Sequence, residues 1–366
     1  AYQGIAGQNP QSDNLVFSPY SVTMAFGMQW AGAVGQTESE IASVMHFEQG
    51  QENVHGALGA LDRHFDRIGS ERPQEFKLSV VNASWALPSL AIESAYLDTL
   101  AFNYDAGVYV LDFDTDTDNS RRTINDWVAQ ETNNTVLELL VEALNPMLSS
   151  AWLVLTNAIY LRARWAQEFN AAETVQGSFE TLSGPVTTDL MYQEYMQLRY
   201  FRGTDYEAVE IPYKGGHTSM LVIMPDQGAF ASFEQTLDAT RFAEAVENLA
   251  PLECVLTLPK FTITLETRFD QLLKDMGMEP SVTQQADFSG LHGGTAYPFF
   301  IGAVIHKAFI AVDEEGTEAG AATAIISVNN SSGGYPVSVT RPFFYFIREH
   351  ETNTILFAGR LMDPTK

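Results

Sequence analysis

The sequence is poor in cysteine and in lysine. Cys254 is the one cysteine among 366 residues, so no disulfide within the chain can stabilise the fold. Lysine and arginine together number 20 against 46 aspartates and glutamates, which gives a formal net charge of −26. This excess of negative charge disfavours nucleic acids, anionic membranes and other polyanions as partners. We therefore expect stability to come from a hydrophobic core.

Long apolar runs are also missing. No stretch reaches the ~18 apolar residues of a membrane-spanning helix. Residues 1–10 lack the basic start and the apolar run of a signal peptide, although a signal peptide that had been removed would leave no trace. The compartment therefore stays open, with an extracellular or periplasmic location preferred to a cytoplasmic one.

Motifs of enzymes are absent as well. The chain has no nucleophile elbow, no dinucleotide-binding or phosphate-binding glycine loop, and no zinc-protease helix. His350-Glu351 begins the zinc pattern, but Thr354 stands where the second histidine is required. We therefore expect no enzymatic activity, no cofactor and no metal site.

Apolar residues make up 45% of the chain, and no linker, repeat or low-complexity tract divides it. A single domain over residues 1–366 is therefore expected.

Ser18-Pro19 marks a helix start with an N-cap and a first-turn proline. Residues 37–40 read as a capping box. Apolar spacing predicts further helices at 124–128 and at 269–276.

Residues 152–161 are apolar on both alternating faces, as in a central strand that is covered on both sides. Asn157 lies in the middle of this run, and a buried amide there must find hydrogen-bond partners. Residues 208–224 and 343–359 each have the pattern of a hairpin. Helices come mostly early and hairpins mostly late, which favours an α+β fold.

The most unusual segment runs from about 314 to 340. Read with a period of two, its small uncharged residues Thr317, Ala319, Ala321 and Thr323 share one face, while Glu318 falls on the other. Such a segment could enter a sheet between two strands without burying a charge. Considered alone, the same composition also fits a flexible surface loop.

The chain as a whole resembles the serpin family over about residues 14–364. Seven motifs carry the resemblance in family order: NLVFSPYS at 14–21, TNAIYL at 156–161 with Trp165, LPKF at 258–261, ADFSG at 286–290, HKAF at 306–309, EEGTEA at 314–319 and RPFF at 341–344.

The resemblance implies an α+β serpin fold with three β-sheets, eight to nine helices and an exposed reactive-centre loop at about 314–340. It also implies a first helix that is truncated at the N-terminus. Inhibitory serpins are suicide substrates, in which the cleaved loop inserts into the central sheet while the protease is still attached as an acyl-enzyme. Such a molecule is kinetically trapped before cleavage.

Family spacing assigns the hinge and the reactive bond of the loop. The bond falls between Asn330 and Ser331 when counted from Glu314, and Val328 and Ser332 are alternative reactive positions. The implied hinge residues are Gly316, Thr317, Glu318, Ala319, Gly320, Ala321, Ala322 and Thr323. Because no lysine or arginine occurs at 316–340, subtilisin-like or elastase-like serine proteases are the expected targets, with papain-like cysteine proteases as the second choice.

Two further groups are implied by resemblance. The shutter, beneath the central sheet, comprises Ser18, Ser21, Asn157 and His306. The breach, where the loop enters the sheet, comprises Trp165, Lys260 and Glu314, with a salt bridge between the last two.

The expected partner is a target protease in a covalent 1:1 complex with a monomer that can form loop-sheet polymers when destabilised. Heparin is not expected, because residues 54–73 lack a basic cluster. The alternative to inhibition is a non-inhibitory serpin with a carrier, chaperone or storage role.

Overall fold

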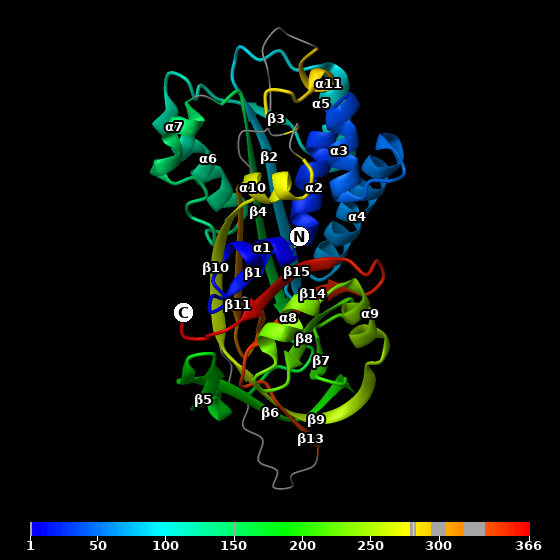
Figure 1. Ribbon diagram of the computed structural model, residues 1–366, viewed down its shortest axis with the longest axis vertical. Helices are drawn as coiled ribbons and strands as arrows, with labels where there is room; N and C mark the ends of the chain where they lie inside the picture. The colour runs from blue at the N-terminus through cyan, green and yellow to red at the C-terminus, as the bar shows by residue number, and fades with distance from the viewer. Residues whose placement is uncertain (1, 150, 279–280, 282, 294–304, 318–333) are drawn as a thin grey trace.

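The computed structural model describes residues 2–149, 151–278, 281, 283–293, 305–317 and 334–366. Figure 1 shows an elongated molecule with helices α2 to α5 toward one end and strands β6 to β9 and β13 at the other. The described α-helices are α1 (Tyr2–Gln8), α2 (Pro19–Trp30), α3 (Gly35–Met45), α4 (Gln51–Glu71), α5 (Ser94–Tyr104), α6 (Thr117–Glu131), α7 (Asn145–Leu148), α8 (Phe230–Thr236), α9 (Ala239–Glu247), α10 (Asp270–Asp275) and α11 (Ser289–His292). Short 3₁₀ turns lie at Glu142–Leu144 and Ala171–Glu173.

The described residues thus contain more helices than the eight to nine expected. Part of the excess comes from one-turn helices such as α7 and α11, which are too short to leave a periodic signal in the sequence. None of the described helices is both long and apolar enough to cross a membrane.

The predicted start of α2 is confirmed, whereas the predicted start of α3 is wrong. Ser18 caps α2 as predicted, since its side chain accepts a hydrogen bond from the backbone N–H of Ser21. The capping box at 37–40 is wrong, because α3 already begins at Gly35. Thr37 instead accepts a hydrogen bond from the backbone N–H of Asp287, 2.8 Å away. A tertiary contact has therefore replaced the local cap.

Six strands form the sheet that carries the candidate site. Their order is β10-β11-β12-β4-β2-β3, with β11 also pairing with β4. The bounds are β2 (Phe76–Ala86), β3 (Val108–Val110), β4 (Leu153–Arg164), β10 (Phe261–Arg268), β11 (Ile305–Val312) and β12 (Gly316–Thr317). The strand predicted at 152–161 is β4, at the centre of this sheet.

Nine strands form the other sheet, in the order β1-β15-β14-β8-β7-β6-β9-β13, with β5 attached to β6. The bounds are β1 (Leu15–Phe17), β5 (Val175–Thr181), β6 (Gly184–Arg202), β7 (Tyr206–Pro212), β8 (Thr218–Pro225), β9 (Ala250–Pro259), β13 (Tyr335–Ser338), β14 (Phe343–Glu349) and β15 (Ile355–Leu361). Both predicted hairpins are present, as β7–β8 and β14–β15.

The described strands connect into two sheets where three were expected. The reason is β6, whose pairing with β9 shifts register between Gln193 and Met196 and whose far end pairs with β7. Tyr195, at the shift, has a left-handed φ of 55°. A bulge of this kind interrupts the ladder locally and bends a long strand, so β6 can pair with β9 on both sides of the shift and with β7 at its far end.

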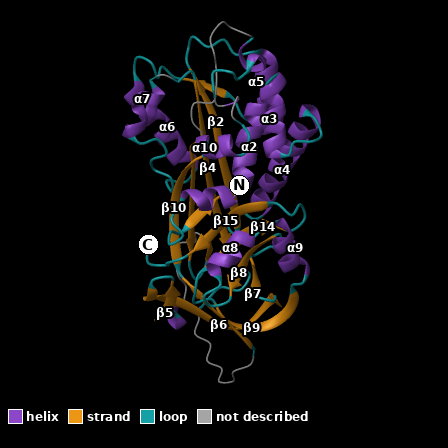
Figure 2. Ribbon diagram, in the orientation of Figure 1, coloured by secondary structure: helices purple, strands orange, loops and turns teal. Residues whose placement is uncertain are grey.

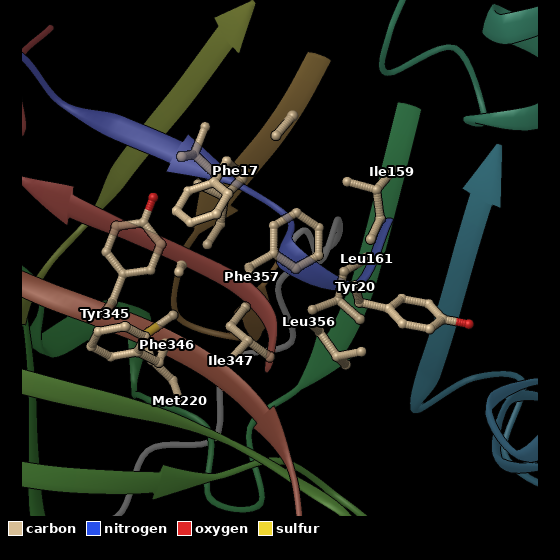
Figure 3. Packing of buried hydrophobic residues seen from close by; sticks show 14 of the residues in the cluster. Phe17, Tyr20, Ile159, Leu161, Met220, Tyr345, Phe346, Ile347, Leu356 and Phe357 are labelled. Atoms are coloured by element: carbon tan, nitrogen blue, oxygen red, sulfur yellow. The ribbon is translucent and has the colours of Figure 1, made fainter. Parts of the chain in front are cut away.

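Buried apolar side chains join the two sheets. Figure 3 shows Phe17 of β1, Ile159 of β4, Tyr345 of β14 and Phe357 of β15 in one cluster, and each of these residues is at most 2% exposed. Figure 2 shows α2 to α6 around the upper strands, with α8 and α9 beside the lower ones. A second buried cluster, which includes Ile124 of α6, covers β2 and β4 from another side.

Cys254 lies in β9 opposite Tyr335 of β13. The cysteine is fully buried, and burial raises the pKa of its thiol to about 11. The thiol is therefore protonated and inaccessible at neutral pH.

Candidate functional site

The two-residue strand β12 lies between β4 and β11. Gly316 is opposite Arg164, and Thr317 is opposite both Ala163 of β4 and Val312 of β11. Both pairings are antiparallel. Farther along, β4 and β11 pair directly with each other in parallel, from Thr156–Ile305 to Ile159–Ala308. We call the junction between β4 and β11 the seam. The start of the 314–340 segment therefore lies between the two strands at one end of the seam, and at the other end the strands are paired directly with each other.

Gly316 has no room for a side chain. A Cβ atom built at this position would lie 2.1 Å from the carbonyl oxygen of Ala163 and 2.8 Å from the Cα of Arg164. Real Cβ atoms do not approach backbone atoms this closely. Glycine is therefore required where the chain turns into the sheet.

Thr317 is directed into the protein. Its side chain is 1% exposed, and its hydroxyl lies 2.5 Å from the hydroxyl of Tyr213. Tyr213 in turn stacks on Trp165, with ring centroids 4.6 Å apart and ring planes 7° apart. Any larger residue at 317 would have to displace this buried aromatic pair.

The three breach residues lie beside β12. The Trp165 indole N–H donates to the carbonyl of Asp313 over 2.9 Å. Lys260 Nζ lies 2.8 Å from Glu314 Oε2, which is the salt bridge expected from the sequence. Thr174 donates to the other carboxylate oxygen over 2.8 Å. Burial alone raises the pKa of Glu314, but the bonds from Lys260 and Thr174 outweigh it and hold the pKa below its usual value.

The four shutter residues meet where β4 and β11 pair directly. Asn157 Nδ2 donates to the carbonyl of Ser21 over 2.9 Å and lies 2.6 Å from the Ser21 hydroxyl. His306 Nδ1 is hydrogen-bonded to Asn157 Oδ1, and the backbone N–H of Ser18 donates to His306 Nε2 over 3.1 Å. These contacts link α2 to both strands of the seam.

The partners of His306 define its protonation state. Because Nε2 accepts from Ser18, the single ring proton is on Nδ1 and is donated to Asn157. Complete burial lowers the pKa of His306 to about 3. The imidazole is therefore neutral at physiological pH, as are its hydrogen-bond partners Ser18 and Asn157.

A family model described as serpin (serine protease inhibitor) matches residues 1–364. The chain is a serpin. It is 33% identical over 367 residues to an uncharacterized serpin-like protein of Thermococcus kodakarensis, covering 99% of this chain and 83% of that protein. It is 32% identical over 374 residues to human Serpin B3 (97% and 94% covered). A leukocyte elastase inhibitor of Xenopus tropicalis is 30% identical over 366 residues (98% and 95%).

Solved serpin structures have the same fold. Thyroxine-binding globulin in complex with thyroxine superposes with a TM-score of 0.87 at 23% identity, covering 100% of this chain and 96% of that one. The thermophilic serpin tengpin in its native state gives a TM-score of 0.87 at 24% identity (99% and 92%). Members of the serpin family are largely protease inhibitors rather than enzymes, and they generally bind target proteases.

The remaining loop predictions lie outside the described residues of this serpin. They comprise the hinge residues Glu318, Ala319, Gly320, Ala321, Ala322 and Thr323 and the reactive positions Val328, Asn330, Ser331 and Ser332. Gly316 and Thr317 are the two hinge residues that the structure describes.

Sequence reasoning missed several partners of these serpin residues. Tyr213 and Thr174 contact the hinge and the breach, and Asn82 of β2 accepts a hydrogen bond from Asn157 Nδ2 over 2.5 Å. Asn82 is opposite Asn157 in the antiparallel pairing of β2 with β4. The position of Asn82 within a mostly apolar strand was a signal that its side chain has a buried polar partner. Identifying that partner as Asn157 requires the register between β2 and β4, which the sequence does not give.

Proposed function

We propose that this serpin inhibits serine proteases as a suicide substrate, by inserting its cleaved reactive-centre loop between β4 and β11. The observation that carries the proposal is the position of Gly316 and Thr317, which already form two residues of that inserted strand. The direct pairing of β4 and β11 beyond them leaves a seam that the rest of the loop could open.

The register of β12 against β4 supports insertion. If this antiparallel pairing continued beyond Thr317, Ala321 would lie opposite Ile159 and Thr323 would lie opposite Asn157. Residues of the same face as Thr317 are then Ala319, Ala321 and Thr323, all small and uncharged. Each would follow Thr317 into the interior without burying a charge. Insertion as far as Thr323 would break the bond between His306 and Asn157.

The release of free energy after cleavage makes trapping irreversible. Residues 317–330 would span roughly 46 Å as a strand at ~3.3 Å per residue. If each new ladder hydrogen bond contributes about 1 kcal/mol net, complete insertion stabilises the cleaved form by on the order of 10 kcal/mol. We propose that this difference moves the acylated protease before it can hydrolyse the ester.

The proposed reactive bond is Asn330–Ser331, with Val328 and Ser332 as alternatives. The absence of lysine and arginine at 316–340 favours proteases that accept small or apolar residues. The relative named leukocyte elastase inhibitor agrees with an elastase-like target, while subtilisin-like enzymes remain equally compatible with the sequence. Papain-like cysteine proteases are the second choice.

The test compares the parent with Thr317→Arg and Thr317→Ser. Each is incubated with subtilisin, elastase, trypsin and papain and then run on denaturing gels. We expect the parent and Thr317→Ser to form an SDS-stable complex with subtilisin or elastase. Thr317→Arg should be cleaved without complex formation, because its charge cannot be buried beside Tyr213. Mass spectrometry of the released peptide gives the cleaved bond.

Two outcomes would contradict this proposal. Cleavage of the parent without a complex, but with a large rise in thermal midpoint, would indicate insertion without trapping, as in a serpin with a carrier, chaperone or storage role. Cleavage with neither a complex nor a rise in midpoint would contradict insertion itself. The solved structure of thyroxine-binding globulin with thyroxine shows that a protein of this fold can bind a small molecule.

A further inference from the structure

Three potential metal ligands converge on one another outside the candidate site described above. His64 lies on α4, Glu349 ends β14, and Glu351 lies in the turn before β15. One ligand atom from each residue lies within 4.8 Å of the others. His64 Nε2 and Glu349 Oε1 are 3.5 Å apart. Segments distant in the sequence therefore bring together one imidazole and two carboxylates.

The imidazole nitrogen at this junction lacks a hydrogen-bond partner. Nε2 of His64 is buried, and the separation of 3.5 Å from Glu349 does not satisfy hydrogen-bond geometry. The His64 side chain is 12% exposed and that of Glu349 is 0% exposed. Leaving a buried polar atom without a hydrogen bond costs free energy, so we expect this nitrogen to bind a ligand.

We propose that His64, Glu349 and Glu351 form a binding site for a divalent transition-metal ion, with Zn²⁺ as the best fit. Two ligands that are each about 2.1 Å from a tetrahedral zinc lie ~3.4 Å apart, close to the observed separation of His64 and Glu349. Glu351 is exposed and can rotate to supply the third ligand. The nitrogen donor favours zinc over calcium and magnesium, which prefer oxygen ligands alone.

The surroundings hold the Glu349 carboxylate in place for this role. Its Oε2 accepts from the backbone N–H of Thr352 over 2.8 Å and from the Thr352 hydroxyl over 2.6 Å. Its Oε1, the atom nearest to His64, accepts from the backbone N–H of Glu351 over 2.9 Å. Hydrogen bonds of this kind orient metal ligands, so the Glu349 side chain loses little conformational freedom when a metal binds.

Arg67 competes with the metal. Its guanidinium lies 3.1 Å from His64 Nδ1 and donates to it, which places the ring proton on Nε2. Metal binding at Nε2 requires the proton on Nδ1, so the exposed Arg67 must move away. Replacing Arg67 with glutamine removes both this competing donor and a nearby positive charge, and should tighten zinc binding several-fold.

The test is calorimetric titration of the metal-free full chain with Zn²⁺. We expect one site per chain in the parent, an affinity at least ~10-fold weaker in His64→Gln and in Glu351→Gln, and a tighter site in Arg67→Gln. Glu351 is exposed, so its variant should fold normally even if His64→Gln does not. Co²⁺ used in place of Zn²⁺ should give the visible absorption of a four-coordinate ion in the parent.

His46→Asn is the matched control, because His46 is exposed and its left-handed backbone, with φ of 58°, is well tolerated by asparagine. This variant should bind zinc as the parent does. A fixed concentration of Zn²⁺ should also raise the thermal midpoint of the parent and of this control by more than that of Glu351→Gln. A parent that binds no zinc at micromolar concentration, or a Glu351→Gln variant that binds it as tightly as the parent, would overturn the proposal.

Discussion

The surroundings of Gly316 and Thr317 limit the size of the side chain at each position. Position 316 must lack a side chain because the backbone of β4 lies against it. Position 317 must have a short side chain because Tyr213, which stacks on Trp165, lies against it. Together these requirements determine how the segment enters the sheet, and they are stricter than the general preference for small residues that the sequence suggests.

The contact of Gly316 leads to a first prediction. Gly316→Ala should lower the free energy of unfolding by about 1–3 kcal/mol, because the new methyl group must push β12 away from β4. The measurement is the denaturant midpoint. Gly56→Ala is the control, since a Cβ at this position on α4 meets nothing within 4 Å. We expect that variant to be neutral or slightly stabilised. Equal effects of the two substitutions would argue against the close approach.

A second prediction concerns the salt bridge from Lys260 to Glu314. Lys260 is 35% exposed, so solvent screens the pair, and Lys260→Met should cost only about 0.5–1 kcal/mol. The larger effect should be on assembly, because the loosened end of the sheet could accept the loop of a second molecule. Native gels after mild heating should show more polymer than for the parent.

Lys274→Met is the control for that experiment, because Lys274 is an exposed lysine on α10 and its loss changes the net charge equally. Polymer formation that is the same in both variants would attribute the effect to charge alone.

Among the secondary-structure elements, β4 and β11 are held together by an uncharged network. The shutter residues connect these strands to α2 through bonds that require a neutral histidine, since a second ring proton on His306 would oppose the Ser18 N–H. The seam therefore depends on pH through this one side chain.

The third prediction follows from the lowered pKa of His306. The folded value is about 3 and the usual value is about 6.5, so between these pH values the unfolded chain binds a proton that the folded chain does not. Stability should therefore fall as the pH drops below 6.5, by about 2 kcal/mol at pH 5 from this residue. His55, whose pKa burial lowers to about 4, adds to the same trend.

The measurement is the denaturant midpoint between pH 5 and 6.5, above the range in which most carboxylates titrate. His306→Gln should flatten the dependence, whereas His46→Asn, at an exposed position, should leave it unchanged. A parent with no loss of stability over this range would contradict the neutral, buried imidazole.

The sequence predicted individual elements and local hairpins better than contacts between distant segments. A run that is apolar on both faces located β4, hairpin patterns located β7–β8 and β14–β15, and a local cap located the start of α2. The position of Thr37 inside α3 could not be predicted, because a contact with the distant Asp287 overrides its local signal.

The candidate site shows the same division. Resemblance to serpin motifs grouped the residues that we expect to form the shutter and the breach, and the side chains of each group lie together in the structure. Asn82 and Tyr213 could not be identified, because strand register depends on packing across the whole sheet. His64 and Glu349 likewise come from segments that only the tertiary fold brings together.

For the molecule as a whole, the excess of acidic side chains is the dominant electrostatic feature. With 46 acidic and 20 basic residues, repulsion outweighs attraction when summed over the surface. Most ion pairs among the described residues are at least partly exposed, so each contributes little to stability.

The fourth prediction is that dilute salt stabilises the protein. Raising NaCl from about 0.01 M to about 0.15 M shortens the screening length from ~30 Å to ~8 Å, which weakens repulsion between distant carboxylates. The thermal midpoint should rise over this range. Chloride is used because sulfate would also act through exclusion from the surface. A midpoint that falls with NaCl would mean that specific ion pairs outweigh the net charge.

The burial of Cys254 also has a practical use. Because this thiol is inaccessible and protonated at neutral pH, maleimide dyes should leave it unmodified in the folded protein. A cysteine engineered at any exposed position would then react alone, without first removing the native one. Fluorophores attached in this way could follow the separation of β4 and β11 in real time while a protease is present.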